Sequence, residues 1–283
     1  MNILRARTAG FCMGVGLALR KLDEALALQK KGEGRLVMLG PIIHNPQVLD
    51  SYTRQGVICA ESPADIRPGD TVLIRAHGIP REVEASLRNL GATILDATCP
   101  RVKEAQLAID NATRTGGSLY LFGEAEHPEV RGLVSYANGP CHVFGSLREL
   151  KEEQPFAHED TVILAAQTTQ EREEFEAIKI WLAGSYGLTV LDTICDATRR
   201  RQEEARALSA QAEAMIVVGG KSSGNTRRLA DVARSCGIPV QHIETPDELS
   251  ADALRGCATV GLTAGASTPR SIIDAMEQAL SRL

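Results

Sequence analysis

The sequence predicts an α/β protein of three small modules that are related by a pseudo-threefold, trefoil-like repeat. The first observation is a segment ending in cysteine that occurs three times: "ILRARTAGFC" at 3–12, "GATILDATC" at 91–99 and "GLTVLDTIC" at 187–195. The second is an apolar stretch ending in glycine that follows each cysteine after a helical stretch: "GRLVMLG", "GSLYLFG" and "AMIVVGG". Their joint register indicates an internal repeat.

A second apolar stretch completes each copy of the repeat: "DTVLIRAHG", "DTVILAAQTT" and "ATVGLTAGAS". Strands that alternate with helices are typical of βαβ units with parallel sheets. The length of 283 residues alone suggests roughly two domains. The repeat instead predicts three modules, which comprise residues 13–98, residues 99–194, and residues 195–283 together with 1–12.

Charge and hydropathy exclude several classes of protein. The net charge is −5 and the basic residues are scattered, so no basic surface indicates a nucleic-acid partner. No apolar run approaches the roughly 18 residues of a membrane span, so we expect no membrane partner. The first residues resemble a signal peptide, but glycines interrupt their apolar patch, and Leu19, Leu22 and Leu26 continue it as an amphipathic helix. We therefore expect this segment to be the first folded element of a cytoplasmic protein.

The cysteines fall into two groups. Seven cysteines are an odd number without a C-x-x-C pair, and in a reducing cytosol we do not expect disulfides. Cys12, Cys99 and Cys195 end the three equivalent segments, where the N-terminus of the following helix lowers a thiol's pKa. Pro100 fits the first turn of such a helix. The remaining four are interpreted as small buried hydrophobic residues: Cys59, Cys141, Cys236 and Cys257.

Polar residues follow the other strands of the repeat as well. Parallel α/β sheets bind ligands beyond the carboxyl ends of their strands, beside helix N-termini. Three modules around an axis would direct these side chains into one central cavity. They are Cys12, His44 and His77 in the first copy, Cys99, His127, Glu129 and Thr168 in the second, and Cys195, Ser223, Asn225 and Ser267 in the third.

Three thiolates that meet on an axis suit a metal. Structural zinc sites use four ligands at short spacings, which this sequence lacks. Iron–sulfur clusters are held by thiolates, commonly four for a cubane. A cubane with three cysteine ligands leaves one iron open, and an open metal can act as a Lewis acid on a substrate oxygen. The number of thiols therefore predicts a central iron–sulfur cluster with a catalytic function.

Nine motifs between residues 9 and 269 resemble the LytB family of 4-hydroxy-3-methylbut-2-enyl diphosphate reductases. They are "AGFCMGVGLAL", "GPIIHNPQV", "RAHGIP", "DATCPRV", "GEAEHPEVRG", "AQTT", "TICDAT", "GGKSSGNTRRL" and "TAGASTP". The resemblance implies one [4Fe–4S] cluster per chain on Cys12, Cys99 and Cys195, with one iron lacking a protein ligand. It also implies removal of the substrate's allylic hydroxyl by two electrons and two protons. The products are isopentenyl and dimethylallyl diphosphates and water, in the last step of the non-mevalonate pathway.

The resemblance implies three catalytic residues in the second module. Glu129 matches the proton source, His127 a residue near the substrate's oxygen, and Thr168 a hydrogen-bonding partner of the hydroxyl end. A carboxyl group in a closed site can have a raised pKa and deliver a proton. Without the resemblance, Glu129 is equally well explained as a solvated carboxylate at the start of a helix. His127 is equally well explained as a buried histidine whose hydrogen bonds are satisfied. Thr168 and Glu171 have the spacing of a capping box.

The resemblance also implies a cradle for the substrate's diphosphate. Besides His127 and Thr168, the substrate-binding residues are His44, His77, Ser223, Asn225 and Ser267. Without the resemblance, the sequence near Ser267 is explained as an ordinary helix start, and "SSGN" as an ordinary turn. The family loop often reads Asn-Ser-Ser-Asn, so Gly224 removes one hydroxyl. Asp196 places a carboxylate next to Cys195.

The electrons must come from outside the chain. No NAD(P) or flavin fingerprint is present, because "GGKSSGN" lacks the G-x-G-x-x-G spacing. We therefore expect a one-electron donor protein, ferredoxin or flavodoxin. Two alternatives stay open. A cluster-dependent dehydratase similar to quinolinate synthase would need no external reductant, and an iron–sulfur redox sensor would bring a DNA-binding or effector module.

Overall fold

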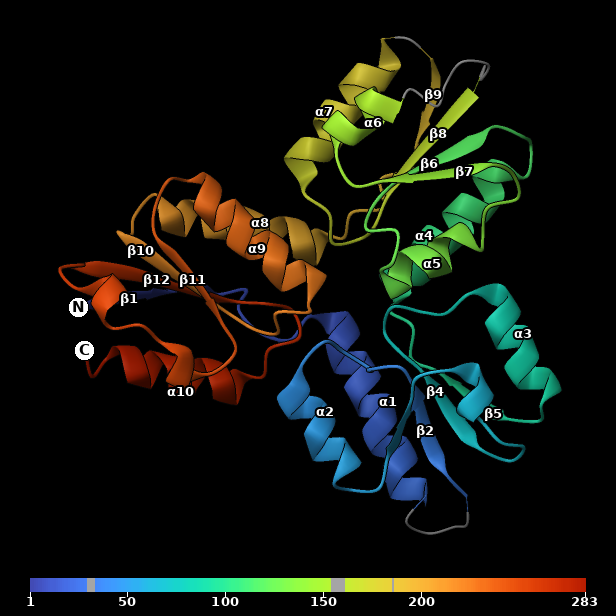
Figure 1. The fold of residues 1–283 in the computed structure, drawn as a ribbon, viewed down its shortest axis with the longest axis horizontal. Coiled ribbons are helices and arrows are strands. Elements are labelled where there is room, and N and C mark those ends of the chain that lie inside the picture. The colour runs from blue at the N-terminus through green and yellow to red at the C-terminus, as the bar shows by residue number, and fades with distance from the viewer. Residues whose placement is uncertain (30–33, 154–160, 185) are drawn as a thin grey trace. The chain divides into compact units, whose positions relative to one another are not determined.

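The described residues of the chain form three parallel β-sheets of four strands each (Figure 1). The computed structural model describes residues 1–29, 34–153, 161–184 and 186–283. The first sheet contains β2 (Leu36–Leu39), β3 (Ile58–Ala60), β4 (Thr71–Ile74) and β5 (Thr93–Asp96). The second contains β6 (Ser118–Phe122), β7 (Cys141–Phe144), β8 (Thr161–Ala166) and β9 (Gly187–Val190). The third contains β10 (Ala214–Val218), β11 (Val240–Ile243), β12 (Thr259–Ala264) and β1 (Asn2–Arg5).

The strand order is the same in all three sheets. The orders are β5-β4-β2-β3, β9-β8-β6-β7 and β1-β12-β10-β11. In each sheet the strand that precedes a predicted cluster cysteine lies at one edge. It pairs in parallel with the second apolar strand of the repeat, as β5 does with β4. The α/β class and the threefold repeat are therefore confirmed.

Helices cover the sheets and connect their strands. The helices of the first third of the chain are α1 (Met13–Gln29), α2 (Pro46–Thr53) and α3 (Arg81–Asn89). Those of the middle are α4 (Pro100–Thr113), α5 (Pro128–Val134), α6 (Leu147–Glu153) and α7 (Arg172–Ala183). The last are α8 (Asp196–Ser209), α9 (Gly224–Ser235) and α10 (Arg270–Leu280). Short 3-10 turns lie at Pro63–Asp65, Pro246–Glu248 and Asp252–Leu254.

Each sheet has apolar side chains on both faces, as parallel sheets require. In the second sheet Leu119 and Leu121 of β6 pack with residues of α4 and α5, and the alternate residues Tyr120 and Phe122 pack with residues of α6 and α7. The third sheet has the same construction, with α8 and α9 on one face and α10 on the other. Each fully buried Leu or Phe side chain contributes about 1.5–3 kcal/mol to the stability of the fold, relative to leaving it exposed.

A glycine ends the first strand of each copy, as the sequence predicts. The backbone N–H groups of Gly40, Gly123 and Gly219 donate to the last residues of the neighbouring edge strands at 2.8–2.9 Å. At Gly123 a Cβ atom would lie 2.8 Å from Val130 Cγ2 on α5. The missing side chain therefore lets α5 begin close to the end of β6.

The chain divides into two compact units. One comprises Met1–Gly16, Ile43–Ser51 and Asp196–Leu283, and the other comprises Leu17–Ile42 and Tyr52–Cys195. The predicted module ranges 13–98, 99–194 and 195–283 with 1–12 stay a prediction, because the first two sheets share one unit. Among the described residues no helix is both long and apolar enough to cross a membrane.

Candidate active site

Three cysteines lie at equivalent junctions between a strand and a helix. Cys12 directly precedes α1, Cys99 precedes α4 and is its N-cap, and Cys195 precedes α8. Their N–H groups donate to the carbonyls of Ala266, Ala76 and Thr168 at 3.2, 2.9 and 3.0 Å. Each acceptor is the second residue after the paired strand. We call Cys12, Cys99 and Cys195 the junction cysteines.

The junction cysteines fit the donor set of a metal cluster. All three cysteines are half-buried, so a sulfur atom can face a ligand and still be shielded. Each stands at the N-terminal end of a helix, where the dipole favours negative charge. Pro100 occupies the first turn of α4, as predicted. The residues present therefore fit thiolate ligation.

The prediction that the other cysteines are buried is wrong for two of them. Cys59, on the edge strand β3, and Cys236, at the C-cap of α9, are exposed. Short edge segments end in solvent, so their cysteines need not pack in a core. Cys141 is half-buried on β7, and burial raises the pKa of its thiol to about 11. Such a thiol is a poor metal ligand at neutral pH.

Glu129 is a buried carboxyl group at the start of α5. Its exposed fraction is 1%, although it belongs to the first turn of the helix, where glutamates are ordinarily solvated. Desolvation raises the pKa of Glu129 to about 7, against the lowering effect of hydrogen bonds from the Thr168 backbone and side chain. A carboxyl group with this pKa is partly protonated at neutral pH and can donate a proton.

Thr168 connects Glu129 to one junction cysteine. Its N–H donates to Glu129 Oε1 at 2.6 Å, and its carbonyl accepts from the N–H of Cys195 at 3.0 Å. The capping-box prediction is wrong, because α7 begins at Arg172 and its N-cap is Glu171. The chain turns away after β8, and the Thr168 hydrogen bonds go to α5 and the Cys195 segment rather than to α7.

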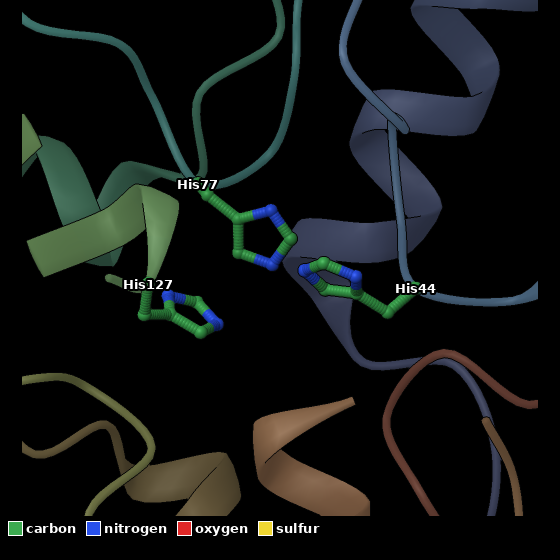
Figure 2. A group of neighbouring side chains, drawn as sticks. All are labelled: His44, His77 and His127. Atoms are coloured by element: carbon green, nitrogen blue, oxygen red, sulfur yellow. The ribbon is translucent and has the colours of Figure 1, made fainter. Parts of the chain in front are cut away.

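His127 and His77 lie beside each other in the same compact unit. Their ring centroids are 5.3 Å apart with an interplanar angle of 86° (Figure 2). His127 is the N-cap of α5, and its Nδ1 accepts from the N–H of Glu129 at 3.1 Å. In the neutral ring this bond leaves the proton on Nε2. His127 thus has both a structural bond and a donor atom for a ligand.

The turn that carries His77 packs tightly on α4. Gly78 has a φ of +74°, and a Cβ atom there would lie 2.8 Å from Gln106 Nε2. Gln106 is buried on α4, the helix that Cys99 caps. The position of His77 is therefore coupled to the helix that follows a junction cysteine.

His44 and Ser267 lie together in the other compact unit. Ser267 Oγ donates to the carbonyl of His44 at 3.2 Å. A Cβ atom at Gly220 would lie 2.6 Å from the same carbonyl, so the loop after β10 also approaches this backbone. The predicted helix start near Ser267 is correct, since α10 begins at Arg270 with Pro269 as its N-cap.

The "SSGN" segment forms the N-terminus of α9 rather than an isolated turn. Ser223 is the N-cap, and its Oγ accepts from the N–H of Thr226 at 3.4 Å. Gly224 is the first helical residue. Asn225 Nδ2 is buried and has no hydrogen-bond partner among the described residues. An unused donor at a helix N-terminus favours an anionic ligand.

Two charged residues near these loops belong to the surface. Asp196 is 58% exposed and lies 3.5 Å from Arg199, one turn along α8. Lys221 is 60% exposed and pairs with Glu248.

Sequence reasoning missed Gln167 within the motif "AQTT". Its side chain is fully buried, and its Oε1 accepts from the N–H of Glu124 at 3.1 Å. This bond joins the end of β8 to the loop before α5, and so helps to hold Glu129. The sequence feature that indicates this role is a glutamine placed directly after an apolar strand.

The fold and the junction cysteines together define a class. Its members are three-module α/β proteins with one cysteine per module at a strand-to-helix junction. The comparisons with known proteins identify the family within this class.

The chain belongs to the LytB family, whose model, described as LytB protein, matches residues 3–281. A 4-hydroxy-3-methylbut-2-enyl diphosphate reductase of Desulfovibrio desulfuricans is 56% identical over the whole of both chains. One of Aquifex aeolicus is 40% identical over 100% of this chain and 97% of the relative.

Two solved structures share the fold. One, described as (E)-4-hydroxy-3-methyl-but-2-enyl diphosphate reductase, the terminal enzyme of the non-mevalonate pathway, is 40% identical with a TM-score of 0.70 and full coverage of both chains. The reductase of Plasmodium falciparum has a TM-score of 0.93 at 24% identity, covering 99% of this chain and 88% of that one. This second likeness supports the fold alone.

Proposed function

We propose that the chain is a reductase of 4-hydroxy-3-methylbut-2-enyl diphosphate. The C–O bond of the allylic alcohol breaks, the oxygen leaves as water with one proton, and the carbon skeleton takes up two electrons and a second proton. The products are isopentenyl and dimethylallyl diphosphates, at the end of the non-mevalonate pathway. Membership of the LytB family over residues 3–281 is the observation that carries the proposal.

Cys12, Cys99 and Cys195 are the residues that would hold a [4Fe–4S] cluster. Their equivalent junctions and their half-buried thiols support this assignment. When bound, the cluster supplies electrons and one iron without a protein ligand that acts as a Lewis acid toward the hydroxyl group. The ligand set and the type of cluster are parts of the proposal.

Glu129 is the proposed proton donor for the departing hydroxyl. Because desolvation raises its pKa to about 7, the carboxyl group holds a proton near neutral pH that an exposed glutamate would have lost. Thr168 holds the carboxyl group through its N–H and through its side chain, which orients the group for proton transfer. His127, whose Nδ1 is occupied by the Glu129 N–H, presents Nε2 toward the substrate.

The diphosphate is the proposed ligand of His44, His77, Ser223, Asn225 and Ser267. Asn225 supports this role through its buried and unused Nδ2. Ser223 supports it as the N-cap of α9, where the helix dipole favours a polyanion. Hydroxyl, amide and imidazole groups can donate hydrogen bonds to the phosphate oxygens, so the cradle does not need lysine side chains.

The proposed electron donor is ferredoxin or flavodoxin, acting twice in each turnover. A two-electron reduction that uses one-electron carriers requires two encounters. The cytoplasmic location, expected because the first residues continue as an amphipathic helix rather than as a signal peptide, stays a prediction.

The deciding experiment is anaerobic purification with quantification of iron and sulfide. It is followed by an assay of 4-hydroxy-3-methylbut-2-enyl diphosphate consumption with reduced methyl viologen. We expect iron and sulfide in the ratio of a cubane and release of both diphosphate products. Turnover without any reductant would instead support the dehydratase, and a chain that binds no substrate would contradict the proposal.

A matched pair of variants tests the proton donor. Glu129→Gln is expected to keep its cluster and its substrate affinity but lose about 10²–10⁴-fold in turnover, the usual contribution of a general acid. The control is Glu126→Gln, because Glu126 is 86% exposed in the loop before the same helix. Near-normal turnover of Glu129→Gln would remove Glu129 from this role.

A further inference from the structure

The segment that presents Cys12 is the longest of the three cysteine-bearing connections. It runs from residue 6 to residue 12, between β1 and α1, whereas the equivalents run over 97–99 and 191–195. The N–H of Cys12 also makes the longest of the three equivalent hydrogen bonds, 3.2 Å against 2.9 and 3.0 Å. A longer connection has more conformational freedom, so this cysteine needs additional support to be held in place.

Glu204 of α8 holds the first half of this segment. Its carboxylate accepts from the N–H groups of Arg7 and Thr8, both at 2.8 Å, and from Thr8 Oγ1 at 2.5 Å. Desolvation alone would raise the pKa of Glu204, but the hydrogen bonds from Thr8 and Arg7 lower it overall. The carboxylate is therefore the stable form and keeps its three donors at neutral pH.

Arg201, one turn earlier on α8, holds the second half. Its side chain is buried, and its Nη2 donates to the carbonyl of Gly10 at 2.6 Å. Its Nη1 donates to the carbonyl of Ala197 on its own helix at 3.0 Å. Gly10 has a φ of +107°, and a Cβ atom there would lie 3.3 Å from Ile273 Cδ1. The guanidinium thus fixes a turn that lies two residues before Cys12.

We propose that Arg201 and Glu204 are positioning residues for Cys12. Arg201 donates to a backbone carbonyl of residues 7–10, and Glu204, one turn further along α8, accepts from backbone N–H groups of the same segment. The side chain of Cys12 is thereby oriented before a cluster binds. Groups around metal ligands that fix them in this way typically change metal affinity by about 10–100-fold when they are removed. This inference rests on the proposed cluster.

The test uses Glu204→Gln and Arg201→Lys. The amide of glutamine turns a donor toward the segment's N–H groups, and the lysine ammonium has no planar fork to reach two carbonyls. Matched controls are Glu203→Gln and Arg200→Lys, exposed neighbours on the same helix. Because Glu203 pairs with Arg199 on its own helix, the controls keep residues 7–10 in place.

Three readouts are measured, none of which depends on turnover. The first is the rate of iron release from the reconstituted protein to a chelator. The second is the EPR spectrum of the reduced cluster, and the third is the rate at which iodoacetamide alkylates Cys12 in the metal-free chain. We expect Glu204→Gln and Arg201→Lys to release iron about 10–100-fold faster than the parent protein. Both should show a changed alkylation rate at Cys12 but not at Cys99.

A third variant covers the case in which a charged substitution impairs folding. Thr8→Val removes one donor to Glu204 and keeps both charges, so a smaller acceleration of iron release is expected. Unchanged iron release, EPR signal and alkylation in all three variants would overturn the proposal, as would equal changes in the controls. If the parent protein binds no cluster, the proposed function fails, while the alkylation rates still decide whether Arg201 and Glu204 orient Cys12.

Discussion

At the scale of single residues, the buried carboxyl of Glu129 has the most specific chemistry. Water cannot solvate its charge, and only the Thr168 hydrogen bonds favour the ionised form. The result is a pKa near 7 in a side chain whose ordinary pKa is 4.5. Both protonation states are therefore accessible near neutral pH, which a proton donor requires to be recharged after each turnover.

This pKa predicts a pH-dependent rate. Turnover is expected to fall as the pH rises through about 7, by roughly tenfold per pH unit well above it, because the donor loses its proton. The measurement is kcat against pH with reduced methyl viologen, with the cluster content checked at each pH. A profile without a limb near pH 7 would contradict the assignment.

The same pKa predicts how stability depends on pH. Between 4.5 and about 7 the folded protein keeps the Glu129 proton that the unfolded chain loses. The contribution of Glu129 to stability is therefore complete below pH 4.5 and decreases as the pH rises through this window. Urea unfolding of the metal-free protein at several pH values should show this decrease in the parent. The difference between parent and Glu129→Gln should level off above about pH 7.

At the scale of elements, the starts of helices α5 and α9 each carry polar residues of the candidate site. In α9 the N-cap Ser223 stabilises the helix, whereas Asn225 Nδ2 has no protein partner in the described chain. Neighbouring residues of one helix start thus differ in what they contribute to folding and to binding.

Two alanine variants should separate these contributions. Ser223→Ala is expected to lower the free energy of unfolding by about 1 kcal/mol, the usual cost of a lost N-cap. Asn225→Ala should change stability by less than about 0.5 kcal/mol but weaken the binding of inorganic diphosphate. Urea unfolding and titration calorimetry measure the two quantities, with exposed Asp231→Asn as the control in α9. Equal diphosphate affinity of parent and Asn225→Ala would exclude Asn225 from the cradle.

The turn between β6 and α5 makes a second prediction at this scale. Gly123→Ala places a Cβ atom 2.8 Å from Val130 Cγ2, so α5 must shift, at a cost of about 1–3 kcal/mol. Because α5 carries Glu129, turnover should fall together with stability. Gly184→Ala is the control, since its Cβ atom would meet nothing closer than 3.5 Å. A Gly123→Ala protein with normal stability and turnover would contradict this account.

At the scale of the whole molecule, three sheets repeat one strand order and deliver one cysteine each. Equivalence in the fold predicts equivalence in function. Cys12→Ser, Cys99→Ser and Cys195→Ser should each lose most of the iron on anaerobic reconstitution, while Cys236→Ser should retain it. Iron per chain is the measurement, and unfolding of the metal-free proteins checks that folding is intact. Full retention of iron by any one junction variant would refute the shared ligand set.

Much of this architecture could be predicted from the sequence because it depends on repetition. Apolar stretches, glycines and cysteines in one register predict the strands, the repeat and the junctions, and Figure 1 shows the resulting sheets. Side-chain partners do not repeat in this way. Thr168 and Glu171 have the spacing of a cap, yet tertiary hydrogen bonds to Glu129 and Cys195 decide the role of Thr168.

The residues that sequence reasoning missed act across long separations in the chain. Glu204 and Thr8 are 196 residues apart, and no local pattern indicates their contact. The exposure of Cys59 depends in the same way on its strand lying at a sheet edge. Motifs identify chemistry, but partners from distant segments require the folded chain.

The pairing of β1 with β12 has a consequence for biosynthesis. Asn2 aligns with Thr259 and Arg5 with Leu262, so β1 is translated long before the other strands of its sheet, which lie between Ala214 and Ala264. Closing such a large loop is slow, and nascent chains form nearby contacts first. Residues 2–12 must therefore wait, unpaired, through most of synthesis.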